Sequence, residues 1–183
     1  FDVSTSTLVP IAGAVALAKA VKNTLDIDVS VKWPNDITLD GKKVAGMLVD
    51  ASFQANNIDY LILGIGINFD IDATKIEKRL SNSANFYGVN SLRKKDDSTP
   101  PKILLKEFLV QFEKTLIQLN KGEKAKIVKE WTQKADKIGK KITINTSDGH
   151  ISGVAQGIDN DGALRLKTSK GVKRIFVGDV VSE

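Results

Sequence analysis

Residues 28–36 read Asp-Val-Ser-Val-Lys-Trp-Pro-Asn-Asp, a short alternating run that a proline then interrupts. The alternation predicts a strand over residues 28–33, in which the valines and the tryptophan share one face. Lys32 lies on the other face, and Asn35 and Asp36 follow in the break, where polar side chains reach ligands or cap turns. From the residues alone two interpretations stay open. Either this is a strand end with a surface lysine, or the ammonium points into a cleft and holds anionic groups.

A second stretch, residues 41–49, reads Gly-Lys-Lys-Val-Ala-Gly-Met-Leu-Val. With residues 37–39 before it, this stretch predicts a hairpin around Asp40-Gly41, whose second strand covers residues 43–50. Gly46 interrupts that strand, and a glycine in a strand often marks a bulge or a close approach of the backbone to another group. A simple accommodation of neighbouring side chains remains the alternative for Gly46.

The third stretch, residues 61–68, reads Leu-Ile-Leu-Gly-Ile-Gly-Ile-Asn. Gly64 and Gly66 lie on one face of the expected strand 59–68, so together they form a bare trough where a flat or linear ligand fits against the backbone. The alternative is that the two glycines only make room for a helix that packs against this strand. Since the run is apolar on both faces, we expect a strand in the middle of a sheet. Asn68 ends it with a donor and an acceptor.

The remaining pattern changes character near Asp136. Before it, helical spacing predicts helices over residues 7–25, 73–80, 100–119 and 123–134, with a long polar loop over 81–97. After it, period-2 strands are predicted over residues 141–146, 151–158, 163–168 and 172–177. Short strands at even spacing, with glycine in each turn, are typical of a small SH3-like barrel. We therefore expect two domains, 1–136 and 137–183.

Composition limits the classes of function. The 183 residues include no cysteine and one histidine, which removes disulfides and thiolate nucleophiles and leaves almost no room for a zinc centre. No apolar run reaches the roughly 18 residues of a membrane span. The net charge of +5 is spread evenly, and the barrel's basic residues lack interleaved aromatics, so nucleic acid is not an expected partner. The lack of cysteine fits a cytoplasmic protein.

In this order and spacing, the three stretches strongly resemble the biotin protein ligases. The carrying motifs are Lys-Trp-Pro-Asn-Asp from Lys32, Lys-Val-Ala-Gly from Lys43, and Gly-Ile-Gly-Ile-Asn from Gly64. The resemblance extends from about Thr7 to Val181. Lipoate ligases share the fold but not the Trp-Pro-Asn-Asp run, so biotin is favoured. The resemblance implies an α+β fold, with helices packed on a mixed sheet in the catalytic domain and a C-terminal SH3-like β-barrel.

The resemblance also implies an activity. The family joins biotin to ATP, giving biotinyl-5′-adenylate and pyrophosphate, and then transfers biotin to a lysine of a carboxylase's biotin carrier domain. Lys32 would be the catalytic lysine, contacting the biotin carboxylate and the α-phosphate. The implied biotin-binding residues are Lys32, Gly46, Met47, Gly64 and Gly66. The implied ATP-binding residues are Lys32, Asn35, Asp36, Lys43 and Asn68. Phe86 or Tyr87 would cover the adenine.

One feature of the family is missing. An arginine- and glycine-rich loop is expected upstream of the first helix, whereas this sequence contains no Gly-Arg pair. We therefore expect the chain to lack the N-terminal part of its catalytic domain, with activity depending on what precedes Phe1. The alternative is a non-catalytic fragment or binding module that contacts the acceptor domain or a sister subunit. The implied substrates are ATP and biotin, with Mg²⁺ bound mostly through phosphates and no metal site made by residues. A homodimer stays open.

Overall fold

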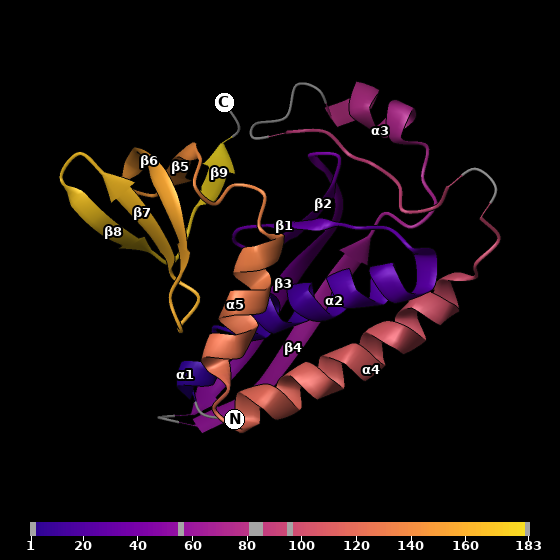
Figure 1. Cartoon of the computed structure of the whole chain (residues 1–183), viewed down its shortest axis with the longest axis horizontal. Coiled ribbons are helices and arrows are strands. Elements are labelled where there is room, and N and C mark those ends of the chain that lie inside the picture. Colours follow the sequence, from indigo (N-terminus) through magenta and orange to yellow (C-terminus); the bar gives the residue numbers. More distant parts are fainter. Residues whose placement is uncertain (1–2, 55–56, 81–85, 95–96, 182–183) are drawn as a thin grey trace.

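The computed structural model describes residues 3–54, 57–80, 86–94 and 97–181. The chain forms two sheets that lie side by side, with the helices gathered around the first (Figure 1). The helices are α1 (Val3–Ser6), α2 (Val9–Leu25), α3 (Ala73–Leu80), α4 (Pro101–Asn120) and α5 (Lys124–Lys134). The strands of the first sheet are β1 (Ser30–Lys32), β2 (Asp36–Leu39), β3 (Lys42–Gln54) and β4 (Asn57–Ile67). Those of the second are β5 (Lys141–Thr146), β6 (Gly149–Ile158), β7 (Leu164–Thr168), β8 (Gly171–Ile175) and β9 (Asp179–Val181).

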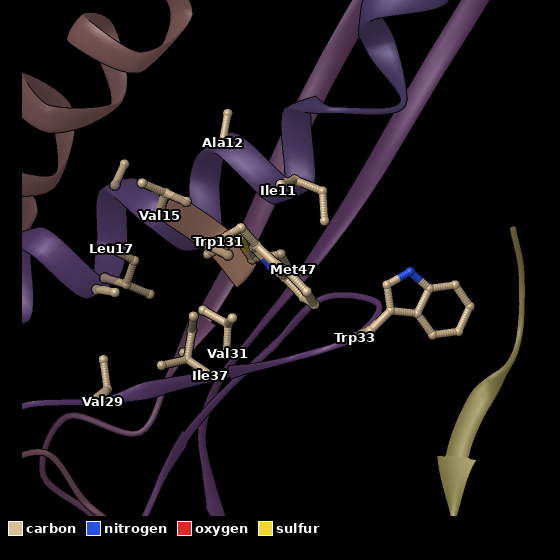
Figure 2. Close-up of a cluster of buried hydrophobic side chains, with 14 of the residues drawn as sticks. Ile11, Ala12, Val15, Leu17, Val29, Val31, Trp33, Ile37, Met47 and Trp131 are labelled. Carbon is tan, nitrogen blue, oxygen red and sulfur yellow. The ribbon is translucent and has the colours of Figure 1, made fainter. Parts of the chain in front are cut away.

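The first sheet has the order β1-β2-β3-β4, and every pair in it is antiparallel. Helix α2 packs on one face of this sheet, between α4 and α5. Its alanines keep the helix surface thin, so that backbone and sheet come close. A Cβ on Gly13 would lie 3.0 Å from both Leu63 and Met47, which shows how near the sheet's side chains approach. Figure 2 shows Val31, Ile37 and Met47 gathered beneath this helix with Trp131.

The second sheet has the order β8-β7-β6-β5-β9, again antiparallel. This is the expected SH3-like arrangement, with β9 returning beside β5 as a strand that the period-2 pattern did not predict. Trp33 points away from α2 towards this sheet (Figure 2), and its indole Nε1 donates a hydrogen bond to the Gly162 carbonyl at 3.2 Å. The turn between β6 and β7 therefore touches the end of β1.

The expected α+β class and the SH3-like sheet are confirmed, and the four predicted helices lie within a few residues of α2, α3, α4 and α5, whereas α1 was not predicted. Two expectations were wrong. The first sheet is antiparallel throughout its described strands instead of mixed, and its two parallel contacts, Val31 with Ala135 and Lys43 with Val89, are isolated bridges. Strand β4 is also an edge strand of the described sheet instead of a central one.

The reason for the second error lies in the two faces of β4. One face packs against the core through alternate apolar residues, while Ile62 on the other face is 58% exposed. An apolar run predicts two covered faces, but the part of the chain that the structure describes covers only one. The predicted loop over 81–97 lies partly outside the described residues. Among the helices within the described ranges, none has the length and apolarity needed to cross a membrane.

Candidate functional site

The face of the first sheet opposite α2 carries the predicted site residues in one row. The strand register pairs Lys32 with Asp36, Asp36 with Gly46, and Gly46 with Gly66. Directly paired residues point to the same face of a sheet, so this row crosses all four strands on one side. Gly64 joins the same face in the adjacent row, opposite Leu48. The ammonium of Lys32 and the bare positions of β4 are therefore on the same side of the sheet.

A β-bulge brings Lys43 onto this face as well. The register shifts between Ile37 and Thr38, so that Val44 and Ala45 together stand opposite one residue of β2. Without the extra residue, Lys43 and Gly46 would point to opposite faces, because side chains alternate along a strand. With it, the Lys43 side chain lies directly over Gly46, where an added Cβ would come within 2.8 Å of Lys43 Nζ.

Two asparagines of the site hold the backbone in this shape. Asn68 donates from its backbone N–H to the Val44 carbonyl at 2.7 Å and from Nδ2 to the Lys43 carbonyl at 3.1 Å, so it fastens the bulge. Asn35 exchanges hydrogen bonds with Met47: the Met47 N–H donates to the Asn35 carbonyl at 3.0 Å, and Asn35 Nδ2 donates to the Met47 carbonyl. The Met47 side chain is 3% exposed in the core beneath α2 (Figure 2), so Met47 borders the trough with its backbone only.

The charged groups of the site form a connected cluster. Lys43 Nζ is 2.5 Å from Asp36 Oδ1, and the Tyr87 hydroxyl donates to Asp36 Oδ2 at 2.7 Å. The ring of Tyr87 in turn covers Lys32, whose Nζ lies 3.2 Å from the ring centroid. Lys32 is only 6% exposed, and this burial lowers its pKa to about 8, although Asp36 and Asp136 act in the opposite direction. Burial, together with the hydrogen bond to Asp36, raises the pKa of Tyr87.

Two neighbouring cavities open onto this face. The first, of about 540 Å³, extends from the first sheet to strand β9 of the second. Its lining includes Lys32, Asn35, Asp36, Lys43, Asn68, Phe86, Tyr87 and Asp179. The second, of about 530 Å³, is the trough over the glycines, and its lining includes Lys43, Gly46, Met47, Gly64, Gly66 and Asn68. Lys43 and Asn68 belong to both, so the cavities adjoin.

All the predicted site residues therefore border one of two adjoining cavities. Sequence reasoning missed three acidic and aromatic contributions: the Tyr87 hydroxyl on Asp36, Asp136 near Lys32, and Asp179 from the barrel. Tyr87 and Asp179 are far from Lys32 along the chain, and no local pattern marks them. Asp136 follows a helix with an ordinary amphipathic pattern, so nothing in the local sequence marked it as a site residue.

This geometry suits a ligand with a charged end and a flat apolar end. Lys32 and Gly66 are three strand spacings apart, which is about 14 Å at roughly 4.8 Å per spacing. Lys32 lies at one end of the row and Lys43 over its middle, and a Cβ added to Gly66 would meet nothing within 4 Å at the other end. For a metal ion the residues fit poorly: in the described ranges no three His, Cys, Asp or Glu side chains gather to hold one.

Two family models match parts of this chain. The model of the biotin/lipoate A/B protein ligase family matches residues 4–68, and that of the biotin protein ligase C terminal domain matches residues 137–181.

Two curated relatives extend the likeness. The bifunctional ligase/repressor BirA of Bacillus spizizenii is 30% identical over 91% of this chain and 50% of its own length. The biotin–[acetyl-CoA-carboxylase] ligase of Paracoccus denitrificans is 29% identical over 82% of this chain and 62% of its own length. The chain thus spans about half the length of the BirA relatives that it matches.

Solved structures share the fold. The apo biotin protein ligase of Aquifex aeolicus superposes with a TM-score of 0.79 at 22% identity, over 98% of this chain and 78% of that one. The same enzyme in complex with biotin and ATP gives a TM-score of 0.76 at 20% identity, over 98% and 75%.

Proposed function

Since this chain belongs to the biotin protein ligase family, we propose that it serves the ATP-dependent activation of biotin and the transfer of biotin to a lysine of a carboxylase's biotin carrier domain. The observation that carries this proposal is the single row Lys32–Asp36–Gly46–Gly66. It aligns a buried ammonium with a bare trough on one face of one sheet. A carboxylate can therefore meet a phosphate at one end while an apolar body lies at the other.

Lys32 is proposed as the catalytic residue of both steps. In the first step an oxygen of the biotin carboxylate attacks the α-phosphorus of ATP, and pyrophosphate leaves. The ammonium of Lys32 would neutralise the carboxylate and phosphate oxygens as they approach, in a buried position where a charge acts more strongly than in water. In the second step the neutral amine of the acceptor lysine attacks the activated carbonyl and AMP leaves. The same ammonium would then stabilise the phosphate of the leaving AMP.

The cavity beside Lys32 is proposed to take the nucleotide. Lys43 would exchange its partner Asp36 for a phosphate, and Asn35 and Asn68 would hold the strands that shape the cavity. Tyr87 or Phe86, both in the lining, would cover the adenine. Magnesium is proposed to arrive with the ATP phosphates, as part of the substrate.

The glycine trough is proposed to take the ring system of biotin. Gly64 and Gly66 leave the backbone bare, and Gly46 and the backbone of Met47 form the side nearer Lys32. The length of the row, about 14 Å, suits an extended ligand whose carboxylate ends a flexible chain. We also propose residues 1–136 as the catalytic part and 137–183 as the barrel domain.

Adenylate formation tests this proposal directly. The protein is incubated with biotin and ATP labelled at the α-phosphate, and labelled biotinyl-adenylate is separated and counted. We expect Lys32→Met to lower the yield at least a hundredfold, while Lys170→Met, in an exposed turn of the barrel, leaves it unchanged. Equal yields from Lys32→Met and the unaltered chain would overturn the role of Lys32.

Calorimetry separates catalysis from the binding-module alternative. A stable analogue of biotinyl-adenylate is titrated into the unaltered chain and into Lys32→Met. Tight binding that Lys32→Met loses supports the ligase site. No binding to either form, together with retained binding to a carrier domain, would favour a non-catalytic module.

A further inference from the structure

Strand β1 has a neighbour on its outer side that the sheet order does not include. An isolated parallel bridge joins Val31 to Ala135, directly after α5. Bridged residues point to the same face, here into the core, and the next residue on each segment points the opposite way. The residues that follow are Lys32 and Asp136. The bridge therefore brings the carboxylate of Asp136 alongside Lys32, on the side away from β2.

The Asp136 carboxylate is left without an obvious structural purpose. Its Oδ1 atom is buried and accepts no hydrogen bond from the part of the chain that the structure describes. Burying such an oxygen without a donor is costly unless a nearby positive charge offsets it. Lys32 supplies that charge. The residue stands where α5 ends and the barrel segment begins, and it is partly buried as a whole.

We propose that Asp136 is a positioning residue for Lys32, which holds the ammonium charged and directed into the cavity from the side opposite Asp36. Lys32 would thus be bracketed by two carboxylates, one from β2 and one from the segment that leads into the barrel. The catalytic consequence rests on the function proposed above. The electrostatic effect on Lys32 does not, and can be measured without any substrate.

The direction of the effect follows from the groups that face Lys32. Burial, Lys137 and Lys43 disfavour the charged amine, Asp36 and Asp136 favour it, and the neutral Tyr87 ring covers it. Asp179 lines the same cavity from β9. Removing one of the two carboxylates that favour the charge must lower the pKa of Lys32 from about 8. A fall of about one unit would reduce the protonated fraction at pH 8 from about a half to about a tenth.

The test is a direct titration of the Lys32 amine by NMR, followed at its Nζ and Cε and assigned with Lys32→Met. We expect Asp136→Asn, which keeps the shape and removes the charge, to lower the pKa of Lys32 by about one unit. Asp136→Glu should restore most of it. Asp148→Asn, in an exposed turn of the barrel, is the matched control and should leave it unchanged.

A second variant protects the test against misfolding of Asp136→Asn. Lys137→Met removes a like charge and is expected to raise the pKa of Lys32. If Asp136→Asn does not move the titration of Lys32 while circular dichroism shows an intact fold, the proposal is wrong, whatever Lys137→Met does.

The pH profile of adenylate formation then separates the two proposals. If both hold, the alkaline limb of the profile moves to lower pH in Asp136→Asn, by as much as the NMR titration moves. If the titration moves and the unaltered chain forms no adenylate at any pH, the positioning role survives and the proposed function fails.

Discussion

Asp36 receives a contact on each carboxylate oxygen, one from Lys43 on the adjacent strand and one from Tyr87, 51 positions along the chain. Because the Tyr87 ring also covers Lys32, Tyr87 and Asp36 together connect the two lysines of the cavity. Lys43 pairs with Asp36 directly above Gly46, in the middle of the row. A phosphate that enters must therefore compete with a carboxylate for Lys43. Lys32, in contrast, is buried, and no carboxylate of the described residues is hydrogen-bonded to it.

The burial of Lys32 should destabilise the folded protein. Its folded pKa of about 8 lies below the ordinary 10.5, so the unfolded chain binds more protons between these values and stability rises with pH across that window. At pH 7 the shift corresponds to about 3 kcal/mol. We expect Lys32→Met to be more stable than the unaltered chain at pH 7 by up to that amount, with the difference shrinking from pH 8 to 10.5. Urea denaturation at several pH values measures it, and a Lys32→Met variant that is less stable at pH 7 would contradict it.

Gly46 should be sensitive to a single methyl group. A Cβ there would approach Lys43 Nζ to 2.8 Å and Asp36 Oδ1 to 3.0 Å, so Gly46→Ala must displace the Lys43 side chain. Since that side chain is flexible, we expect less than about 1 kcal/mol of destabilisation. The proposed function predicts at least a tenfold weaker ATP affinity, measured by calorimetry. An unchanged affinity would exclude Lys43 from the phosphate site.

Among the elements, β3 and β4 do most to shape the site. The bulge in β3 turns Lys43 onto the open face, and Asn68 at the end of β4 fastens it. The same two strands expose an apolar surface, with Leu48 72% and Ile62 58% exposed. A face of this kind is unusual for a surface that stays in water.

The fold should tolerate a side chain at Gly66 in β4, whereas binding of a ligand in the trough should not. An added Cβ on Gly66 meets nothing within 4 Å, and valine favours strands more than glycine does. We expect Gly66→Val to leave the unfolding free energy unchanged or to raise it by up to about 1 kcal/mol. Biotin binding, followed by calorimetry, should weaken at least tenfold because the trough is filled. Ser52→Val, farther along the same face, is the control, and equal biotin affinity in both variants would argue against the trough.

The exposed face should also promote association. Ile62→Lys places a charge on an exposed position of β4 and should change the unfolding free energy by no more than about 0.5 kcal/mol. Sedimentation velocity at rising concentration should show less self-association than in the unaltered chain. Equal association in both would mean that this face is not the one involved.

For the whole molecule, the two sheets act as neighbours in one core. The buried cluster includes side chains from both, and Trp33, next to the catalytic candidate Lys32, reaches the Gly162 carbonyl across 129 positions of sequence. The cavity itself is completed by Asp179 and Val180 of β9. The barrel is therefore part of the wall of the site.

Loss of the Trp33 hydrogen bond should weaken the joint between the sheets. Trp33→Phe removes the indole donor and leaves the Gly162 carbonyl without it, at a cost of about 1 to 2 kcal/mol. Amide hydrogen exchange should accelerate in the turn between β6 and β7 as well as in β1. Acceleration in β1 alone would show that the joint does not depend on this bond.

Much of this arrangement follows from local sequence. Period-3.6 and period-2 runs, glycine turns and the proline after Trp33 predicted the helices, most strands and the change near Asp136, because side-chain spacing alone determines which face of an element is apolar. The parity rule likewise put Gly64 and Gly66 on one face, and Lys32 opposite Trp33. The three motifs pointed to the family.

Only the tertiary structure decided the rest. Which strands pair, and in what register, depends on contacts between residues far apart in sequence, so no local pattern could show that Lys32, Gly46 and Gly66 share a row. The bulge that turns Lys43, the Tyr87 hydroxyl on Asp36 and the bridge that brings Asp136 beside Lys32 have the same origin. Each costs chain entropy or desolvation locally and is stable only because distant segments already hold the backbone in place.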